Sequence, residues 1–257
     1  MLKLKKAFAA VFLSLTWFSP QVYAGEDFIF VTSGSMGFNT FEFPEKLDSP
    51  ITHIMAELAI TGIYSGLIIT LSAAQAVDKA DVSEEDEIGE ADRSDFDFLL
   101  GYQLSPNWTF FGGYKKAETS IDFINRKTKA LEVDRYKQSG PYIGASYSYR
   151  LQRSGKLAFS AAYASLDSDN IFHASVRDAD DTDVEFDDLN GRHKGTTEGF
   201  SFVASWSMPL SPDLIYQAKL RYNDYKQSIS GDFGGQAFNF DVSENHLMLM
   251  IGLSKVF

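Results

Sequence analysis

The sequence predicts an all-β protein, a transmembrane antiparallel β-barrel of ten strands. Three observations lead to this prediction. Apolar side chains recur at every second position, short turns alternate with long polar connections, and the chain ends on an alternating apolar strand. Because successive side chains of a strand point to opposite faces, a period of two indicates strands with one apolar face.

The N-terminal segment predicts export of the chain. Basic residues among the first six are followed by an apolar stretch and by a small-residue cleavage site that ends at Ala24. This order is typical of a secretory signal peptide, which is too short and wrongly flanked to be a membrane anchor. We therefore expect a signal peptide at residues 1–24 and one barrel domain at residues 25–257.

The overall composition excludes several classes of function. The formal net charge is −12 at pH 7, which argues against a nucleic-acid partner because such partners are polyanions. The chain has no cysteine, so it forms neither a disulfide framework nor a thiolate metal site or nucleophile. The mean hydropathy of −0.16 is too low for a helical membrane protein.

The clearest structural unit is a hairpin at residues 95–119. Aromatic and aliphatic residues occupy the even positions from Phe96 to Leu104, and Asp95 and Asp97 begin the opposite face. A tight turn of Ser, Pro and Asn leads into a second alternating strand. The same unit recurs at residues 142–165 and 199–222, which indicates a repeated antiparallel hairpin.

The segment 53–76 is long and apolar enough to suggest a transmembrane helix. However, Glu57 and Gly62 interrupt it, and Ser65 and Gly66 are typical turn residues. We therefore interpret the segment as a pair of strands.

Short turns alternate with long polar connections at residues 77–93, 121–138, 167–196 and 229–243. A sandwich has no reason to place every short turn at one end, whereas a transmembrane barrel has short turns on one side and long loops on the other. We expect strands of about ten residues. Eight strands are well marked from residue 66 onward, and two more are predicted at 27–35 and 52–63. The alternative is eight strands with an N-terminal extension.

The last strand resembles the C-terminal signal of bacterial outer-membrane β-barrel proteins. Its outward positions include Leu249, Ile251 and Leu253, and it ends on Phe257, whereas Lys255 departs from the usual apolar residue. The resemblance to small porin-like barrels implies a location in the outer membrane of a Gram-negative cell envelope. It also implies contact with membrane lipid and lipopolysaccharide, and recognition of this strand by the outer-membrane assembly machinery.

The inward face of such a barrel would carry charged side chains. The residues that we expect to line the lumen are Glu57, Asp95, Asp97, Lys115, Lys219 and Arg221. They could form the selectivity lining of a small porin-like channel for passive solute or ion passage. Alternatively, they could pair into a polar plug, because isolated buried charges are costly. The alternative function is then a non-conducting structural or surface-interaction barrel with acidic extracellular loops.

Four carboxylates alternate within one acidic connection, at Asp181, Asp183, Glu185 and Asp187. Oxygen clusters of this kind suit hard divalent cations, but the spacing is not that of an EF-hand. We favour a solvated acidic loop. Weak binding of calcium or magnesium at the cell surface is the alternative hypothesis, and no cofactor is expected.

An enzyme is the least favoured interpretation. A hydrolase at the outer rim would need a base, and the candidates are His173, His193 and His246, of which the last follows Ser243 and Glu244. Neither a GxSxG nor an HExxH motif is present. We therefore expect no catalytic residue.

Deletion of Phe257 should impair assembly of the barrel, because the terminal aromatic residue is the part of the last strand that most resembles the assembly signal. The amount of heat-modifiable protein in the outer membrane measures this effect. Normal membrane levels of the truncated protein would contradict the prediction.

Overall fold

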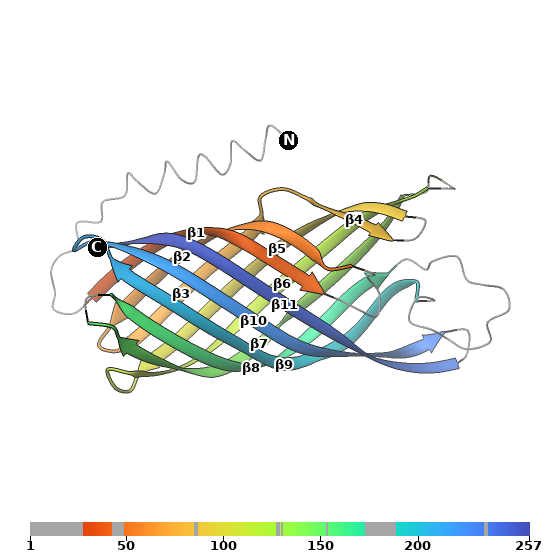
Figure 1. Cartoon of the computed structure of the whole chain (residues 1–257). Helices are drawn as coiled ribbons and strands as arrows, with labels where there is room; N and C mark the ends of the chain where they lie inside the picture. The colour runs from red at the N-terminus through yellow and green to blue at the C-terminus, as the bar shows by residue number, and fades with distance from the viewer. Residues whose placement is uncertain are drawn as a thin grey trace.

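The protein is an antiparallel β-barrel (Figure 1), seen here in a computed structural model. The structure describes residues 28–257 apart from 43–48, 85–86, 127–128, 130, 153, 173–188 and 234–235. The expected signal peptide therefore lies outside the described residues. The strands are β1 (Phe28–Glu42), β2 (Ile51–Tyr64), β3 (Leu67–Ala76), β4 (Ala80–Glu84), β5 (Glu87–Gln103), β6 (Trp108–Asn125), β7 (Leu131–Arg150), β8 (Lys156–Phe172), β9 (Gly191–Pro209), β10 (Leu214–Phe233) and β11 (Gln236–Val256).

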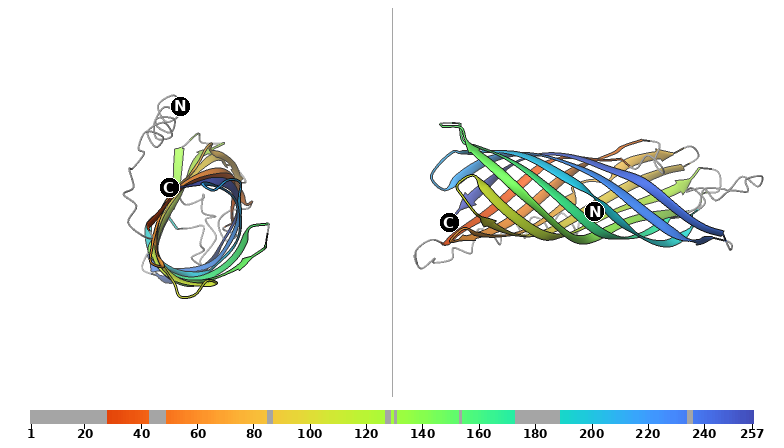
Figure 2. Two further views of the ribbon diagram at one scale, coloured as in Figure 1. Left: turned by 90° about the vertical axis from the view of Figure 1, so that its left-hand side faces the viewer. Right: turned by 90° about the horizontal axis from the view of Figure 1, so that it is seen from below.

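Ten of these strands close into a ring, which is visible along the barrel axis in Figure 2. Each strand pairs with its neighbour in the chain, β1 pairs with β11, and β3 pairs with β5. The short β4 pairs with the far end of β5, beyond the stretch that β3 covers. The predicted ten-stranded all-β barrel is confirmed. Because β1 and β2 belong to the ring, the alternative of eight strands with an N-terminal extension is wrong.

The apolar segment 53–76 forms the β2–β3 hairpin, as predicted. Its turn consists of Ser65 and Gly66, both with positive φ angles, of 47° and 82°. Two consecutive positive φ angles match the twist of antiparallel strands in a two-residue hairpin, which accounts for the glycine at this position. No helix among the described residues is long and apolar enough to cross a membrane.

The strands are longer than the sequence indicated. The strands of the ring contain between 10 and 21 residues. The predicted connections 77–93, 121–138, 167–196 and 229–243 are therefore wrong as loops over most of their described length, because β4 to β11 extend through them. The sequence of these segments resembles that of loops because their outward side chains are polar. Their inward apolar side chains form a second alternating pattern, which the prediction did not include.

The alternating pattern inverts along each long strand, and β6 shows the change. Near its start, Phe110 and Tyr114 point outward and Lys115 points into the lumen. Further along, Ile121 and Phe123 are buried inside, whereas Asp122 is exposed outside. The wall therefore has two zones, which we name the apolar belt and the outer wall.

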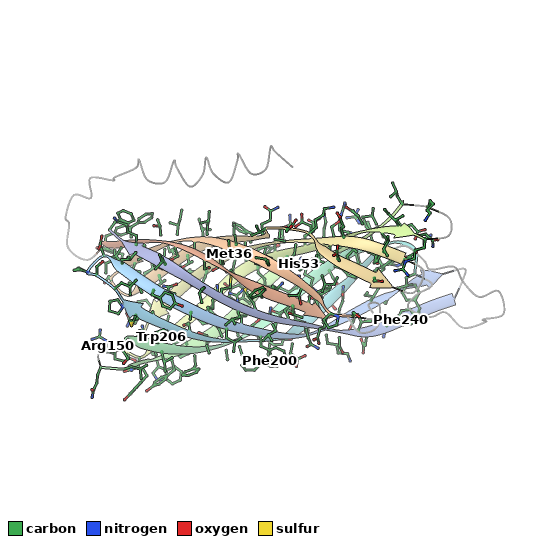
Figure 3. The ribbon with its side chains drawn as sticks, turned by 45° about the horizontal axis from the view of Figure 1, so that its top comes forward. Met36, His53, Arg150, Phe200, Trp206 and Phe240 are labelled. Atoms are coloured by element: carbon green, nitrogen blue, oxygen red, sulfur yellow. The ribbon has the colours of Figure 1, made fainter. Side chains whose placement is uncertain are left out.

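The apolar belt lies next to the short turns. Its outward side chains are large and exposed, as seen for Met36 and Phe200 in Figure 3. Along β5 and the residue that follows it, the belt runs from Phe96 to Leu104, nine residues. This length agrees with the roughly 9–11 residues that a tilted strand needs to cross a bilayer.

The outer wall is polar outside and apolar inside, like the wall of a soluble barrel. Its outer face carries ion pairs, such as Lys226 with Asp241 at 2.7 Å between the neighbouring strands β10 and β11, and Lys79, just before β4, with Asp122 on β6 at 3.0 Å. The hydrogen bond to Asp122 raises the pKa of Lys79. Its interior is one buried apolar cluster, the outer core. The members are Phe41, Ile51, Val82, Ala91, Ile121, Phe123, Tyr136, Phe172, Leu189, Ile229, Phe238 and Val242.

The seam between β1 and β11 closes the ring. Its register runs from Val31 opposite Val256 to Glu42 opposite Asn245. Gly37 lies within this seam, and a Cβ atom there would lie 1.8 Å from the carbonyl oxygen of Leu249. The two strands therefore approach too closely for any side chain at this position.

Gly37→Ala should destabilise the folded barrel by about 1–3 kcal/mol, because overpacking forces the seam apart. Gly34→Ala is the matched control, since a Cβ atom at Gly34 would meet nothing nearer than Leu58 at 3.7 Å. Urea unfolding of both variants in lipid vesicles measures the difference. Equal stability of the two variants would contradict the close approach at the seam.

Candidate functional site

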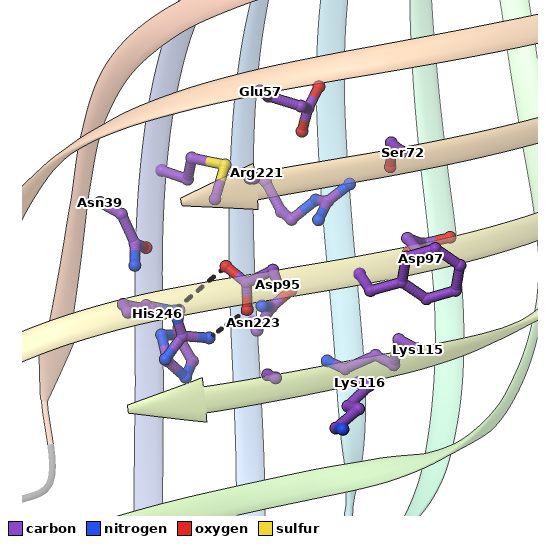
Figure 4. A pocket seen from close by; sticks show the side chains of 15 residues that line it. Asn39, Glu57, Ser72, Asp95, Asp97, Lys115, Lys116, Arg221, Asn223 and His246 are labelled. Atoms are coloured by element: carbon purple, nitrogen blue, oxygen red, sulfur yellow. Dashed lines mark hydrogen bonds and ion pairs between the residues drawn. The ribbon is translucent and has the colours of Figure 1, made fainter. Parts of the chain in front are cut away.

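The six predicted lumen residues converge inside the barrel, at the height where the apolar belt meets the outer wall. Strand β2 supplies Glu57, β5 supplies Asp95 and Asp97, β6 supplies Lys115, and β10 supplies Lys219 and Arg221. All six line one or both of two adjoining cavities inside the barrel. Figure 4 shows the side chains that line one of these cavities. We name this group and its hydrogen-bonding partners the polar layer.

One ion pair crosses the lumen between strands that are not neighbours. The ammonium of Lys219 donates hydrogen bonds to both carboxylate oxygens of Glu57, at 2.6 and 2.8 Å. Strands β1 and β11 lie between β2 and β10, so the pair bridges the ring. The side chains are only 14% exposed for Glu57 and 22% for Lys219, so water screens the pair weakly.

Two tyrosines complete the polar layer. Tyr142 donates a hydrogen bond of 2.5 Å to Asp97, and Lys115 donates one of 2.6 Å to the hydroxyl of Tyr225. The ammonium of Lys115 also lies 4.2 Å from the centre of the Tyr225 ring. These tyrosines are not among the lumen residues predicted from the sequence. Tyr142 lies one residue before the outward-facing Ile143, and Tyr225 lies three residues after the outward-facing Tyr222. These odd spacings were the signal that could have identified both as inward-facing.

Arg93 was missed because it lies in the predicted connection 77–93. It is 7% exposed, and its guanidinium holds the carboxylate of Asp95 with hydrogen bonds of 3.2 and 2.9 Å. It also donates to the hydroxyl of Thr119 at 2.8 Å. The charge of Asp95 is therefore neutralised by Arg93, which lies two residues earlier on the same strand.

His246 faces the lumen and is 3% exposed. Its Nε2 lies 2.5 Å from a carboxylate oxygen of Glu244, which also accepts a hydrogen bond from Gln138 across the lumen. Ser243 lies on the opposite, outward face of β11, so the two do not form a Ser/His arrangement. Phe41 lies opposite His246 on β1, and the two rings stack with their centres 4.9 Å apart.

The other candidate residues at the outer end do not form a described catalytic or metal site. His193 lies beside the backbone oxygen of Asn190 at 3.0 Å and packs between the rings of Phe172 and Phe238. His173 and the four alternating carboxylates (Asp181, Asp183, Glu185 and Asp187) lie outside the described residues. Within the described part of the chain, no group of three or more His, Cys, Asp or Glu side chains could hold a metal ion.

The two cavities differ in size and in lining. A cavity of about 40 Å³ lies among polar residues that include Asn39 and His246. Among the described residues, neither side-chain polar atom of Asn39 has a hydrogen-bond partner, and the same holds for His53 opposite it on β2. A larger cavity of about 410 Å³ extends from the polar layer toward the short turns, and we name it the inner chamber.

The inner chamber exists because its wall carries small side chains. Its lining includes Ala59, Thr70, Ser72, Thr109, Ser146, Ser160, Ala162, Ala164 and Ser201. In the outer core, by contrast, phenylalanine, tyrosine and isoleucine fill the same width of barrel. A barrel of fixed strand number has a nearly fixed interior, so side-chain size decides where space remains.

Comparison with known proteins identifies the fold. No protein-family model and no curated protein sequence matches the chain. Among solved structures, the outer membrane protease OmpT from Escherichia coli matches with a TM-score of 0.54 at 13% identity, over 93% of this chain and 99% of OmpT. The translocator domain of the autotransporter NalP from Neisseria meningitidis matches with a TM-score of 0.49 at 9% identity, over 98% of this chain and 97% of that domain.

The chain has the fold of a bacterial outer-membrane β-barrel. This agrees with the resemblance of its C-terminal strand, in which Leu249, Ile251 and Leu253 face outward on the apolar belt. The terminal Phe257 is fixed to β1, because its N–H donates to the backbone oxygen of Phe30 at 2.8 Å. At 13% identity the likeness to OmpT concerns the fold, and the protease activity is a property of OmpT.

Lys219→Met should lower the free energy of unfolding by about 3 kcal/mol, because it leaves the carboxylate of Glu57 in the lumen without its partner. Replacing both residues, as Glu57→Leu with Lys219→Met, should recover much of this loss. Lys226→Met on the outer wall is the control and should change stability little, since its pair with Asp241 is exposed. Tryptophan fluorescence during urea unfolding in vesicles measures all three. A loss in Lys226→Met as large as that in Lys219→Met would contradict the prediction.

Proposed function

We propose that this protein is an outer-membrane barrel with a closed lumen, and that it acts as a structural or surface-interaction barrel rather than as an open porin-like channel. The observation that carries the proposal is the outer core, which fills the lumen inside the outer wall. Its fold, its apolar belt and the resemblance of its last strand support a location in the outer membrane.

The outer core closes the lumen because its side chains come from all around the ring. Phe41 and Ile51 project from β1 and β2, Phe123 and Tyr136 from β6 and β7, and Ile229 from β10. Each of these side chains is at most 4% exposed. An ion on this path would lose its hydration without gaining polar contacts, which is a large energetic barrier.

The polar layer closes the lumen a second time, on the side of the outer core that faces the short turns. The pair of Glu57 and Lys219 and the hydrogen bond of Gln138 to Glu244 both span the lumen. Passage of an ion through the lumen would require these contacts to break as well. The small side chains that line the inner chamber could border a water path, but they support a porin-like channel over only part of the barrel length.

The outer wall supports the surface role. It extends the barrel beyond the apolar belt and presents side chains of both charges in cross-strand pairs. Lys116 is exposed on β6 at the next outward position after the belt residue Tyr114. Such a cation is suited to the phosphate groups of lipopolysaccharide, which we propose as the partner at this boundary. We propose no catalytic activity, because His246 is buried in the lumen and Ser243 lies on the opposite face of β11.

Purified, refolded protein in a planar bilayer should show no discrete conductance steps, because both closures interrupt the water path. Heat-modifiable migration of the same preparation verifies folding. Reproducible steps with an ion preference would overturn the closed barrel and favour the porin-like channel.

Cysteine labelling tests the same closure on intact cells, since the chain has no native cysteine. A membrane-impermeant maleimide added from outside should label Ser243→Cys, which lies on the exposed face of β11. It should not label Ser72→Cys, which lines both cavities below the outer core. Equal labelling of the two variants would contradict a lumen that is closed on the outer side.

A further inference from the structure

The inner chamber has an excess of positive charge. Its lining includes the cations Lys115, Lys219 and Arg221 and the carboxylates Glu57 and Asp97. Lys219 is paired with Glu57. Lys115 donates a hydrogen bond to the hydroxyl of Tyr225, and Asp97 accepts one from Tyr142. Among the described residues, neither Lys115 nor Asp97 therefore forms a direct ion pair within the layer.

Arg221 is the cation of this group without a direct partner. Among the described residues, no hydrogen bond or ion pair of its guanidinium is found, although Glu57 and Asp97 influence it electrostatically. Figure 4 shows the guanidinium in the space framed by Glu57, Ser72 and Asp97. Its N–H groups are rigidly arranged donors that match a carboxylate or phosphate in a two-point contact.

The chamber continues from this charged end into an apolar region. Ile68, Leu99, Phe111 and Val203 line it together with the small residues already described. The volume of about 410 Å³ falls within the range of about 300–1,000 Å³ that small-molecule sites occupy. The chamber therefore combines one unpaired guanidinium with an apolar wall, which is the arrangement that recognises an organic anion.

We propose that the inner chamber is a binding site for a small organic monoanion, whose carboxylate contacts Arg221 and whose apolar body packs against Leu99, Phe111 and Val203. The ligand would enter from the side of the short turns, since the outer core fills the other end. Short turns of outer-membrane barrels face the periplasm, so the ligand is a periplasmic solute. The site does not require a conducting lumen.

Benzoate is a suitable probe, because it joins one carboxylate to a compact apolar ring. We expect isothermal titration calorimetry on the refolded protein to detect benzoate binding, and binding of benzyl alcohol to be at least about tenfold weaker because the alcohol cannot form the charge-assisted contact. Inorganic phosphate is the second comparison. It carries the charge but not the apolar body, so we expect it to bind more weakly than benzoate.

Three variants locate the site. Arg221→Met should weaken benzoate binding at least about tenfold, whereas Arg221→Lys should retain part of it because the charge remains. Val203→Phe fills the chamber without changing its charge and should also weaken binding. Lys226→Met, on the outer face of the outer wall, is the matched control and should bind benzoate as the unchanged protein does.

The proposal is overturned if folded protein shows no benzoate binding, or if Arg221→Met and Val203→Phe bind benzoate unchanged. Equal affinity for benzyl alcohol, or tighter binding of phosphate than of benzoate, would also overturn it. A conductance measurement is independent of these outcomes, so failure of the chamber site and failure of the closed-lumen proposal can be distinguished.

Discussion

Complete pairing of the backbone is the constraint on which this structure depends. Inside a bilayer no water is present to satisfy an exposed N–H or C=O group, so a sheet must close on itself. In this chain the first and last strands meet along the β1–β11 seam, and Gly37 permits their close approach. The pairing of Phe257 with Phe30 carries the seam to the C-terminus. Every inward side chain owes its position to this closure.

Closure fixes the width of the barrel but not what fills it. The wall passes from lipid to water, so the outward pattern changes from apolar to polar along each long strand. The inward pattern changes in the opposite sense, from the small residues of the inner chamber through the polar layer to the outer core. The half of the barrel with the apolar belt is thus built like a membrane barrel, and the half with the outer wall is built like a soluble one. The polar layer lies where the two patterns meet.

The polar layer links strands that the sheet does not pair. Glu57 with Lys219, Lys115 with Tyr225, and Gln138 with Glu244 each span the lumen. These contacts satisfy most of the charged groups, and among the described residues Arg221 has no direct partner. A charge held in the interior without a partner is costly unless something compensates for it. A bound anion would supply that compensation for Arg221.

The sequence by itself determined the strand period, the short turns and the inward position of Glu57, Asp95, Asp97, Lys115, Lys219 and Arg221. Alternation is a local property, so it can be recognised without knowing which strands meet. The outer wall was mistaken for loops, because its polar outward residues hid an inward apolar set such as Ile121 and Phe123. Only the tertiary structure decided that Lys219 pairs with Glu57, that Arg221 has no direct partner in the described part of the chain, and that the lumen is filled at one end. Those facts depend on contacts between distant strands across a closed ring, where the sum of all inward side chains, and no local pattern, sets the space that remains.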